Sequence, residues 1–123
     1  FRRVLFRSVW PNQRIILVFQ PHRYTRTQEL YADFVDMLET SDHLLLLDIY
    51  SAGEEPIEGI NSLALYGSLK LRGFDKCDYI ENFEHLESHL NDLVRDGDII
   101  LMQGAGSIGQ MIPKLIQKHL VQQ

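Results

Sequence analysis

Four short apolar runs along the chain predict the strands of a single sheet. They cover residues 14–19, 43–49, 77–80 and 98–102. The second run contains four consecutive leucines, Leu44 to Leu47, without any alternation of polar and apolar positions. Such a run is typical of a parallel strand that is covered on both faces. The pattern therefore predicts a sheet with helices on both sides.

The segments between these runs have the period of amphipathic helices. Apolar residues recur three to four positions apart in residues 25–39, 61–72 and 83–94, and again after residue 109. Thr25 and Gln28 have capping-box spacing at the start of the first helix, and Asn82 is placed to cap the third. Strands that alternate with helices build βαβ units. The predicted fold is therefore α/β, a single three-layer domain with a doubly wound, mostly parallel, Rossmann-like sheet.

Composition and charge limit the class of protein. A chain of 123 residues, 45% of them hydrophobic, is long enough for one domain with its own core. The single cysteine, Cys77, predicts a reducing compartment, because secreted domains of this size usually carry paired cysteines. The formal charge of −5 argues against a nucleic-acid or anionic-membrane partner. No apolar run approaches the roughly 20 residues of a membrane span.

The candidate chemistry centres on the polar stretch after the first predicted strand. His22, Arg23 and Arg26 lie where that strand runs into the first predicted helix. Open α/β sheets bind ligands at such strand ends, and the free N–H groups at a helix start attract anions. Because a guanidinium group matches a carboxylate or phosphate, the stretch predicts an anion site. An acidic chain with Arg14 also near this strand supports that interpretation, and solvated arginines around a helix start are the alternative.

Two further strand ends are candidates for the same site. Asp48 closes the second predicted strand, where its carboxylate either faces the cleft or caps the turn at residues 50–53. Gly104 and Gly106 follow the last strand in a G-x-G-x-x-G pattern. A dinucleotide fingerprint belongs on the first βα turn, with an acidic residue about 20 positions later. Only 14 residues, none of them acidic, follow Gly109. The loop is therefore predicted to be a cleft-lining turn or a purely structural one.

The remaining polar groups predict neither a catalytic residue nor a metal site. Glu54, Glu55 and Glu58 are interpreted as a solvated acidic loop without the ligand spacing of a calcium site. His85 and His89 share a helix face, but no third ligand accompanies them. No serine lies in a nucleophile elbow, so the chain offers no self-contained nucleophile.

Three motifs, in this order and spacing, resemble the C-terminal, amino-acid-binding domain of the Mur ligase family. They are FQPHRYTRT from Phe19 to Thr27, DIYSAGE from Asp48 to Glu54, and QGAG from Gln103 to Gly106. The resemblance is to the branch that joins L-alanine to UDP-N-acetylmuramate in peptidoglycan synthesis. It defines residues 14–123 as the domain and leaves residues 1–13 as a segment outside it. The chain starts with Phe1 rather than methionine, which indicates a fragment of a longer protein.

The resemblance implies an ATP-dependent carbon–nitrogen ligase in the bacterial cytoplasm. In this family ATP, with Mg²⁺, phosphorylates the muramate carboxylate, and the amine of L-alanine attacks the acyl phosphate. The placement of Arg23 and Arg26, with His22, then predicts that they bind the carboxylate of L-alanine or a nearby anionic group of the nucleotide sugar. Asp48, Gly104 and Gly106 are further candidates for substrate contacts.

The absence of a G-x-x-x-x-G-K-[ST] loop from the sequence predicts a division of labour. ATP and Mg²⁺ are expected to bind mainly outside this chain, on the missing central domain, and the UDP sugar on the missing N-terminal domain. The chain alone is expected to be inactive. The alternative is a free-standing α/β module that binds an anion or a protein partner and does no chemistry.

Overall fold

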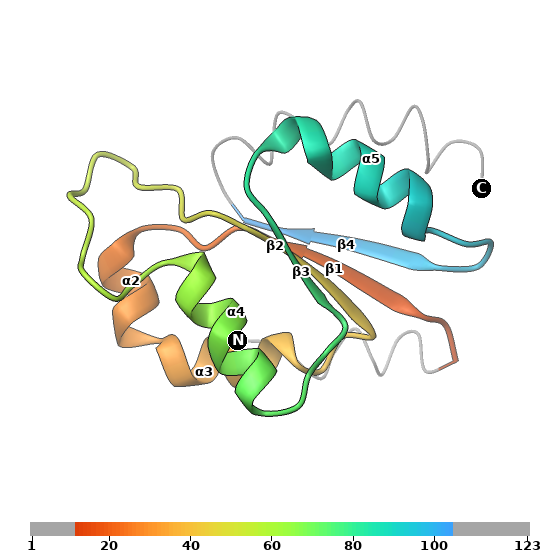
Figure 1. Cartoon of the computed structure of the whole chain (residues 1–123), viewed down its shortest axis with the longest axis horizontal. Helices are drawn as coiled ribbons and strands as arrows, with labels where there is room; N and C mark the ends of the chain where they lie inside the picture. The colour runs from red at the N-terminus through yellow and green to blue at the C-terminus, as the bar shows by residue number, and fades with distance from the viewer. Residues whose placement is uncertain (1–11, 105–123) are drawn as a thin grey trace.

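The computed structural model describes residues 12–104, which form a sheet with helices on both faces (Figure 1). In chain order the elements are β1 (Ile15–Phe19), α2 (Tyr24–Glu29), α3 (Tyr31–Leu38), β2 (His43–Leu47), α4 (Ser62–Leu71), β3 (Cys77–Ile80), α5 (Phe83–Leu93) and β4 (Ile99–Gln103). None of these helices is long and apolar enough to cross a membrane. The helix predicted after residue 109 and the glycines beyond Gly104 lie outside the described residues.

The four strands are all parallel and lie in the order β3-β2-β1-β4. Helices α2, α3 and α4 cover one face of the sheet, and α5 covers the other (Figure 1). This confirms the predicted α/β fold with helices on both sides of the sheet. The chain leaves β1 toward β2 and later returns to β4 on the other side of β1. The strand order therefore reverses between β1 and β4, which is where open α/β sheets bind ligands.

The two central strands contribute to two separate cores. Leu17 and Phe19 of β1 pack with α3 and α4, whereas Ile16 and Val18 pack with Leu86 and its neighbours on α5. All five residues of β1 are buried, and so are four of the five residues of β2. The apolar runs lack alternation because both sides of these strands face a core.

The first predicted helix differs from the structure in two respects. It is broken at Leu30, whose φ of −107° and ψ of 17° separate α2 from α3. The capping box expected from Thr25 and Gln28 is absent, since α2 begins after Arg23 without a side-chain cap. The Thr25 hydroxyl donates instead to Glu54, 2.7 Å away on another loop. A long-range contact has replaced the local one. The Asn82 cap of α5 is confirmed by its acceptance of the His85 N–H.

Candidate functional site

Three loops meet at the carboxyl end of the sheet. The loop after β1 is joined to the end of β4 by the Gln20 N–H, which donates to the Gln103 carbonyl at 2.9 Å. It is joined to the loop after β2 by two bonds of 2.8 Å, from the Tyr50 N–H to the Pro21 carbonyl and from the Arg23 N–H to the Tyr50 carbonyl. The described parts of the three sequence motifs therefore lie together at the carboxyl edge of the sheet, next to the point between β1 and β4 where the strand order reverses.

The predicted anion-binding side chains lie on the loop after β1 and the first turns of α2. Arg23 and Arg26 are exposed, and neither guanidinium group forms a hydrogen bond or ion pair within the described part of the chain. Arg72, by contrast, pairs with two carboxylates. The His22 ring stacks on Tyr50, with centroids 5.8 Å apart and planes inclined by 11°. The edge thus presents two cations beside an aromatic stack.

Arg23 has an unusual backbone conformation. Its φ of 70° and ψ of 145° lie in a region that residues with a side chain rarely adopt. Its carbonyl accepts from the Thr27 N–H at 3.2 Å and from the buried Thr27 hydroxyl at 2.8 Å. Its own N–H donates to Tyr50. Such strain persists only where several contacts hold it, and it is concentrated at functional sites.

Glu54 occupies the start of α2, which corrects two expectations. One carboxylate oxygen accepts from the N–H groups of Tyr24 at 2.8 Å and Thr25 at 3.1 Å, and the other accepts from the Thr25 hydroxyl. Hydrogen bonds from the Thr25 hydroxyl and N–H, with smaller contributions from Tyr24 and the charge of Arg23, hold the pKa of Glu54 below its usual value. Glu54 is therefore a partly exposed loop residue that caps the start of α2, and these two N–H groups are not open to a substrate anion.

Gly104 packs closely against the loop after β1, as a structural turn would, and a cleft-lining role for it stays a prediction. Its φ is +151°, and a Cβ at this position would come within 2.8 Å of the Gln20 carbonyl oxygen. Only glycine allows this close approach of two backbones. The structure thus places Gly104 at the same edge of the sheet as Arg23, at the carboxyl ends of the strands. Gly106 lies outside the described residues.

Gly104→Ala is expected to destabilise the chain by about 1–3 kcal/mol, because the new Cβ meets Gln20 and the backbone is unfavourable for alanine. Gly67→Ala is the matched control. Gly67 lies inside α4, where a Cβ would meet nothing within 4 Å, so this change should stabilise by roughly 0.5–1 kcal/mol. Urea unfolding followed by circular dichroism measures both variants. Equal stability of Gly104→Ala and the unmodified chain would contradict the close approach.

Asp48 is directed away from the arginines. Its exposed carboxylate accepts a hydrogen bond of 2.5 Å from the hydroxyl of Tyr79 on β3, the neighbour of β2 on the side opposite β1. Burial, followed by this bond to the carboxylate, raises the pKa of Tyr79. The described hydrogen bonds contain no Asp48 cap of the turn at residues 50–53, so that interpretation is not supported. A substrate contact from Asp48 stays a prediction.

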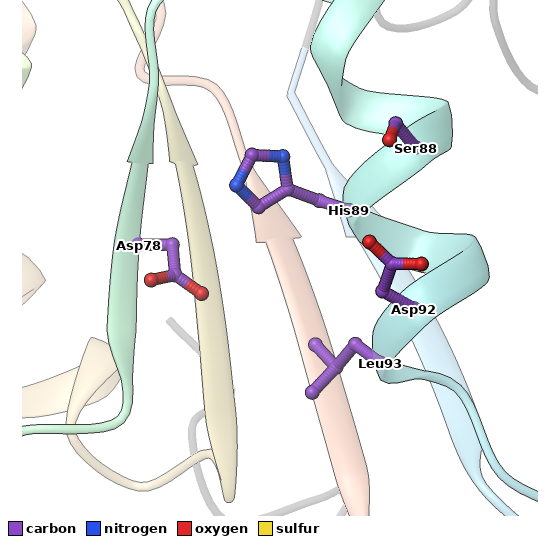
Figure 2. Close-up of a pocket in the computed structure, with 5 residues that line it drawn as sticks. All are labelled: Asp78, Ser88, His89, Asp92 and Leu93. Carbon is purple, nitrogen blue, oxygen red and sulfur yellow. The ribbon is translucent and has the colours of Figure 1, made fainter.

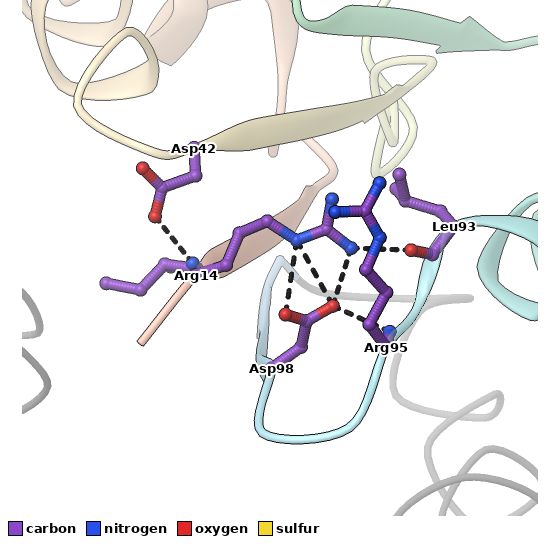
Figure 3. Close-up of polar contacts among 6 residues, drawn as sticks. Arg14, Asp42, Leu93, Arg95 and Asp98 are labelled. Atoms are coloured by element: carbon purple, nitrogen blue, oxygen red, sulfur yellow. Dashed lines mark hydrogen bonds and ion pairs between the residues drawn. The ribbon is translucent and has the colours of Figure 1, made fainter. Parts of the chain in front are cut away.

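Arg14 does not belong to the candidate site, contrary to its grouping with Arg23 and Arg26. It lies at the amino end of β1, where its guanidinium group donates to both carboxylate oxygens of Asp98, at 2.6 Å at the nearest, and to the Leu93 carbonyl (Figure 3). Burial alone would raise the pKa of Asp98, but the bonds from Arg14 and the Arg95 N–H lower it overall. The pair connects the start of β1 to the turn before β4.

A separate hollow of about 260 Å³ lies between β3 and α5. Figure 2 shows its lining residues, which are Asp78, Ser88, His89, Asp92 and Leu93. The Asp78 carboxylate accepts from the His43 ring at 2.8 Å, and the His89 ring lies 2.9 Å from the His85 carbonyl. Across residues 12–104, no three His, Cys, Asp or Glu side chains are grouped so as to hold a metal ion. The five lining residues include none of the candidate site residues.

Comparison with known proteins identifies the family. The model of the family described as "Mur ligase, glutamate ligase domain" matches residues 4–106 of the chain. The chain therefore belongs to this family of Mur ligase C-terminal domains. The match begins at residue 4, inside the segment 1–13 that was predicted to lie outside the domain. The domain boundary at residue 14 stays a prediction.

Three of the similar proteins carry the name of one kind of ligase. The chain is 53% identical over 112 residues to UDP-N-acetylmuramate–L-alanine ligase of Legionella pneumophila (strain Corby), covering 91% of this chain and 24% of the relative. It is 46% identical over 111 residues to the ligase of the same name from Nitrosomonas eutropha, again covering 24% of the relative. The crystal structure of UDP-N-acetylmuramate-alanine ligase MurC from Thermotoga maritima shares the fold, with a TM-score of 0.73 and 21% identity, over 98% of this chain and 24% of that one. The chain thus spans about a quarter of the length of these proteins.

Proposed function

We propose that this chain is the C-terminal domain of an ATP-dependent ligase that joins L-alanine to UDP-N-acetylmuramate in the bacterial cytoplasm. The observation that carries the proposal is the meeting of the three motif segments at one sheet edge, where Arg23 and Arg26 are exposed and unpaired within the described residues. The proposal is supported by the L-alanine ligases to which nine-tenths of the chain is 46–53% identical.

The role proposed for this domain is to position the amino acid. Arg23 and Arg26, with His22 beside them, hold the carboxylate of L-alanine or a neighbouring anionic group of the nucleotide sugar through charge-assisted hydrogen bonds. Fixing the carboxylate leaves the amine free to face the acyl phosphate, and orientation of this kind accelerates a two-substrate reaction. Gly104, at the same edge, is proposed to contact the substrate through its backbone. Gly106 and Asp48 are retained as proposed contacts.

ATP and Mg²⁺ are assigned to the rest of the ligase. Among the described residues no three His, Cys, Asp or Glu side chains are grouped so as to hold a metal ion. Cys77 is not proposed as a nucleophile, because burial raises the pKa of its thiol to about 12. The role proposed for these residues is binding and orientation of the amino acid.

The chain alone is expected to fold but to release no phosphate above the blank from ATP, L-alanine and UDP-N-acetylmuramate. The full-length protein that contains it is expected to release phosphate only when all three substrates are present. A coupled phosphate assay measures both, and cooperative thermal unfolding verifies that the chain is folded. Turnover by the chain alone would contradict the division of labour. A full-length protein that is folded but inactive on these substrates would favour the alternative, an anion-binding module without catalysis.

A further inference from the structure

Glu54 is joined to the start of α2 by three hydrogen bonds, although 29 positions or more separate the bonded residues in the sequence. Its carboxylate accepts from Tyr24 and Thr25, the first two residues of α2, and no residue in the first turn of α2 is itself acidic. The negative charge that stabilises a helix start is thus supplied by Glu54, from the loop after β2. Because Glu54 is ionised and held there, an incoming anion meets the side chains of Arg23 and Arg26 rather than the backbone.

These contacts fix the strained peptide that carries Arg23. The carbonyl of Arg23 and the N–H of Tyr24 belong to one peptide group, whose orientation is set by ψ of Arg23. Thr27 holds the carbonyl end of this group, and Glu54 holds the N–H end at 2.8 Å. The Arg23 N–H is held by Tyr50, on the same loop as Glu54. Removing Glu54 releases one of the contacts that hold the backbone of Arg23 at a φ of 70° and a ψ of 145°.

We propose that Glu54 is a positioning residue for the anion site, acting through the backbone of Arg23. The proposal rests on the function proposed above. In this proposal, the loop after β2 fixes the direction in which the Arg23 side chain leaves the sheet edge. A flexible Arg23 would have to be ordered each time the substrate binds, which weakens binding of the amino acid but leaves the chemistry of the bound complex intact.

Two variants of Glu54 in the full-length ligase separate hydrogen bonding from charge. Glu54→Ala removes the acceptors and is expected to raise the KM for L-alanine about tenfold, with kcat and the KM for ATP within about twofold of the unmodified enzyme. Glu54→Gln keeps an oxygen that accepts from Tyr24 and Thr25, and it removes a negative charge near the incoming carboxylate. Its KM for L-alanine is expected to equal or fall below the unmodified value. Glu55→Ala, the neighbouring exposed glutamate, is the matched control and should leave the KM unchanged.

A double-mutant cycle with Arg23→Ala tests whether Glu54 acts through Arg23. In the Arg23→Ala background, Glu54→Ala is expected to add less than about twofold to the KM for L-alanine. A full additional tenfold there, or an equal rise in KM for Glu54→Gln and Glu54→Ala, would overturn the positioning role. An unchanged KM for Arg23→Ala alone would defeat the proposed function itself. A raised KM for Arg23→Ala with an unchanged KM for Glu54→Ala would defeat only the role of Glu54.

Discussion

Arg23→Ala is expected to raise the KM for L-alanine at least tenfold in the full-length ligase while leaving its fold intact. A charge-assisted, bidentate contact between a guanidinium group and a carboxylate contributes roughly 1.5–3 kcal/mol, and about 1.4 kcal/mol corresponds to a factor of ten. The Arg23 side chain is exposed and makes no hydrogen bond or ion pair within the described residues, so its removal breaks none there. Steady-state kinetics with L-alanine as the varied substrate measures the effect.

Arg72→Ala is the matched control for this experiment. Arg72 is also an exposed arginine, but it follows α4 and pairs with Asp36 of α3 at 2.7 Å and with Glu39, just after α3, at 3.1 Å. Its removal takes away the same charge without touching the sheet edge, so the KM for L-alanine should stay within about twofold of the unmodified value. Equal effects of the two substitutions would show a general influence of charge rather than a site at Arg23.

The second large effect expected is on stability. Asp98→Ala should destabilise the chain by about 3 kcal/mol, because it leaves the Arg14 guanidinium group, one-quarter exposed, without the carboxylate that now accepts from it. It also removes the acceptor of the Arg95 N–H in the turn before β4. Asp96→Ala, an exposed aspartate in the same turn, is the control and should change stability by less than about 0.5 kcal/mol. Urea unfolding at pH 7 measures both variants.

The same pair predicts a dependence of stability on pH. The pKa of Asp98 is lowered in the folded chain, so the unfolded chain binds a proton at Asp98 more readily. The stabilisation from Asp98 is therefore fully present above its unfolded pKa of about 3.9 and is lost as the pH falls toward the folded value. Unfolding free energies measured between pH 7 and pH 3 should fall less steeply in Asp98→Asn than in the unmodified chain. Parallel curves would contradict the assignment of this acid sensitivity to Asp98.

Much of the fold could be predicted because it depends on local pattern. The four strands were located to within two residues at each end, since runs such as Leu44 to Leu47 suit only a strand buried on both faces. Asn82 could be identified as a cap because its contact, to the N–H three residues later, is local. The break at Leu30 has no signal in the apolar stripe, which continues across it.

The contacts that sequence analysis missed all join distant segments. Thr25 appeared able to cap its own helix, but Glu54 on the neighbouring loop takes that place. A usable signal did exist, because loops after adjacent parallel strands emerge at the same edge and a helix start there favours an acidic partner. The grouping of Arg14 with Arg23 was wrong because residues close in sequence can lie far apart in the fold. Arg14 is close to Arg23 in sequence, but a strand separates them and carries them to opposite ends of the sheet.

The most direct test of the arginine site compares L-alanine with L-alaninamide, which keeps the amine and the methyl group but lacks the carboxylate. The unmodified full-length ligase should prefer L-alanine by at least about tenfold in kcat/KM, because only L-alanine offers an anion to Arg23 and Arg26. Arg23→Ala should lose most of that preference, chiefly through a higher KM for L-alanine. If the well-folded Arg23→Ala variant discriminates between the two amines as strongly as the unmodified enzyme, Arg23 does not hold the amino-acid carboxylate.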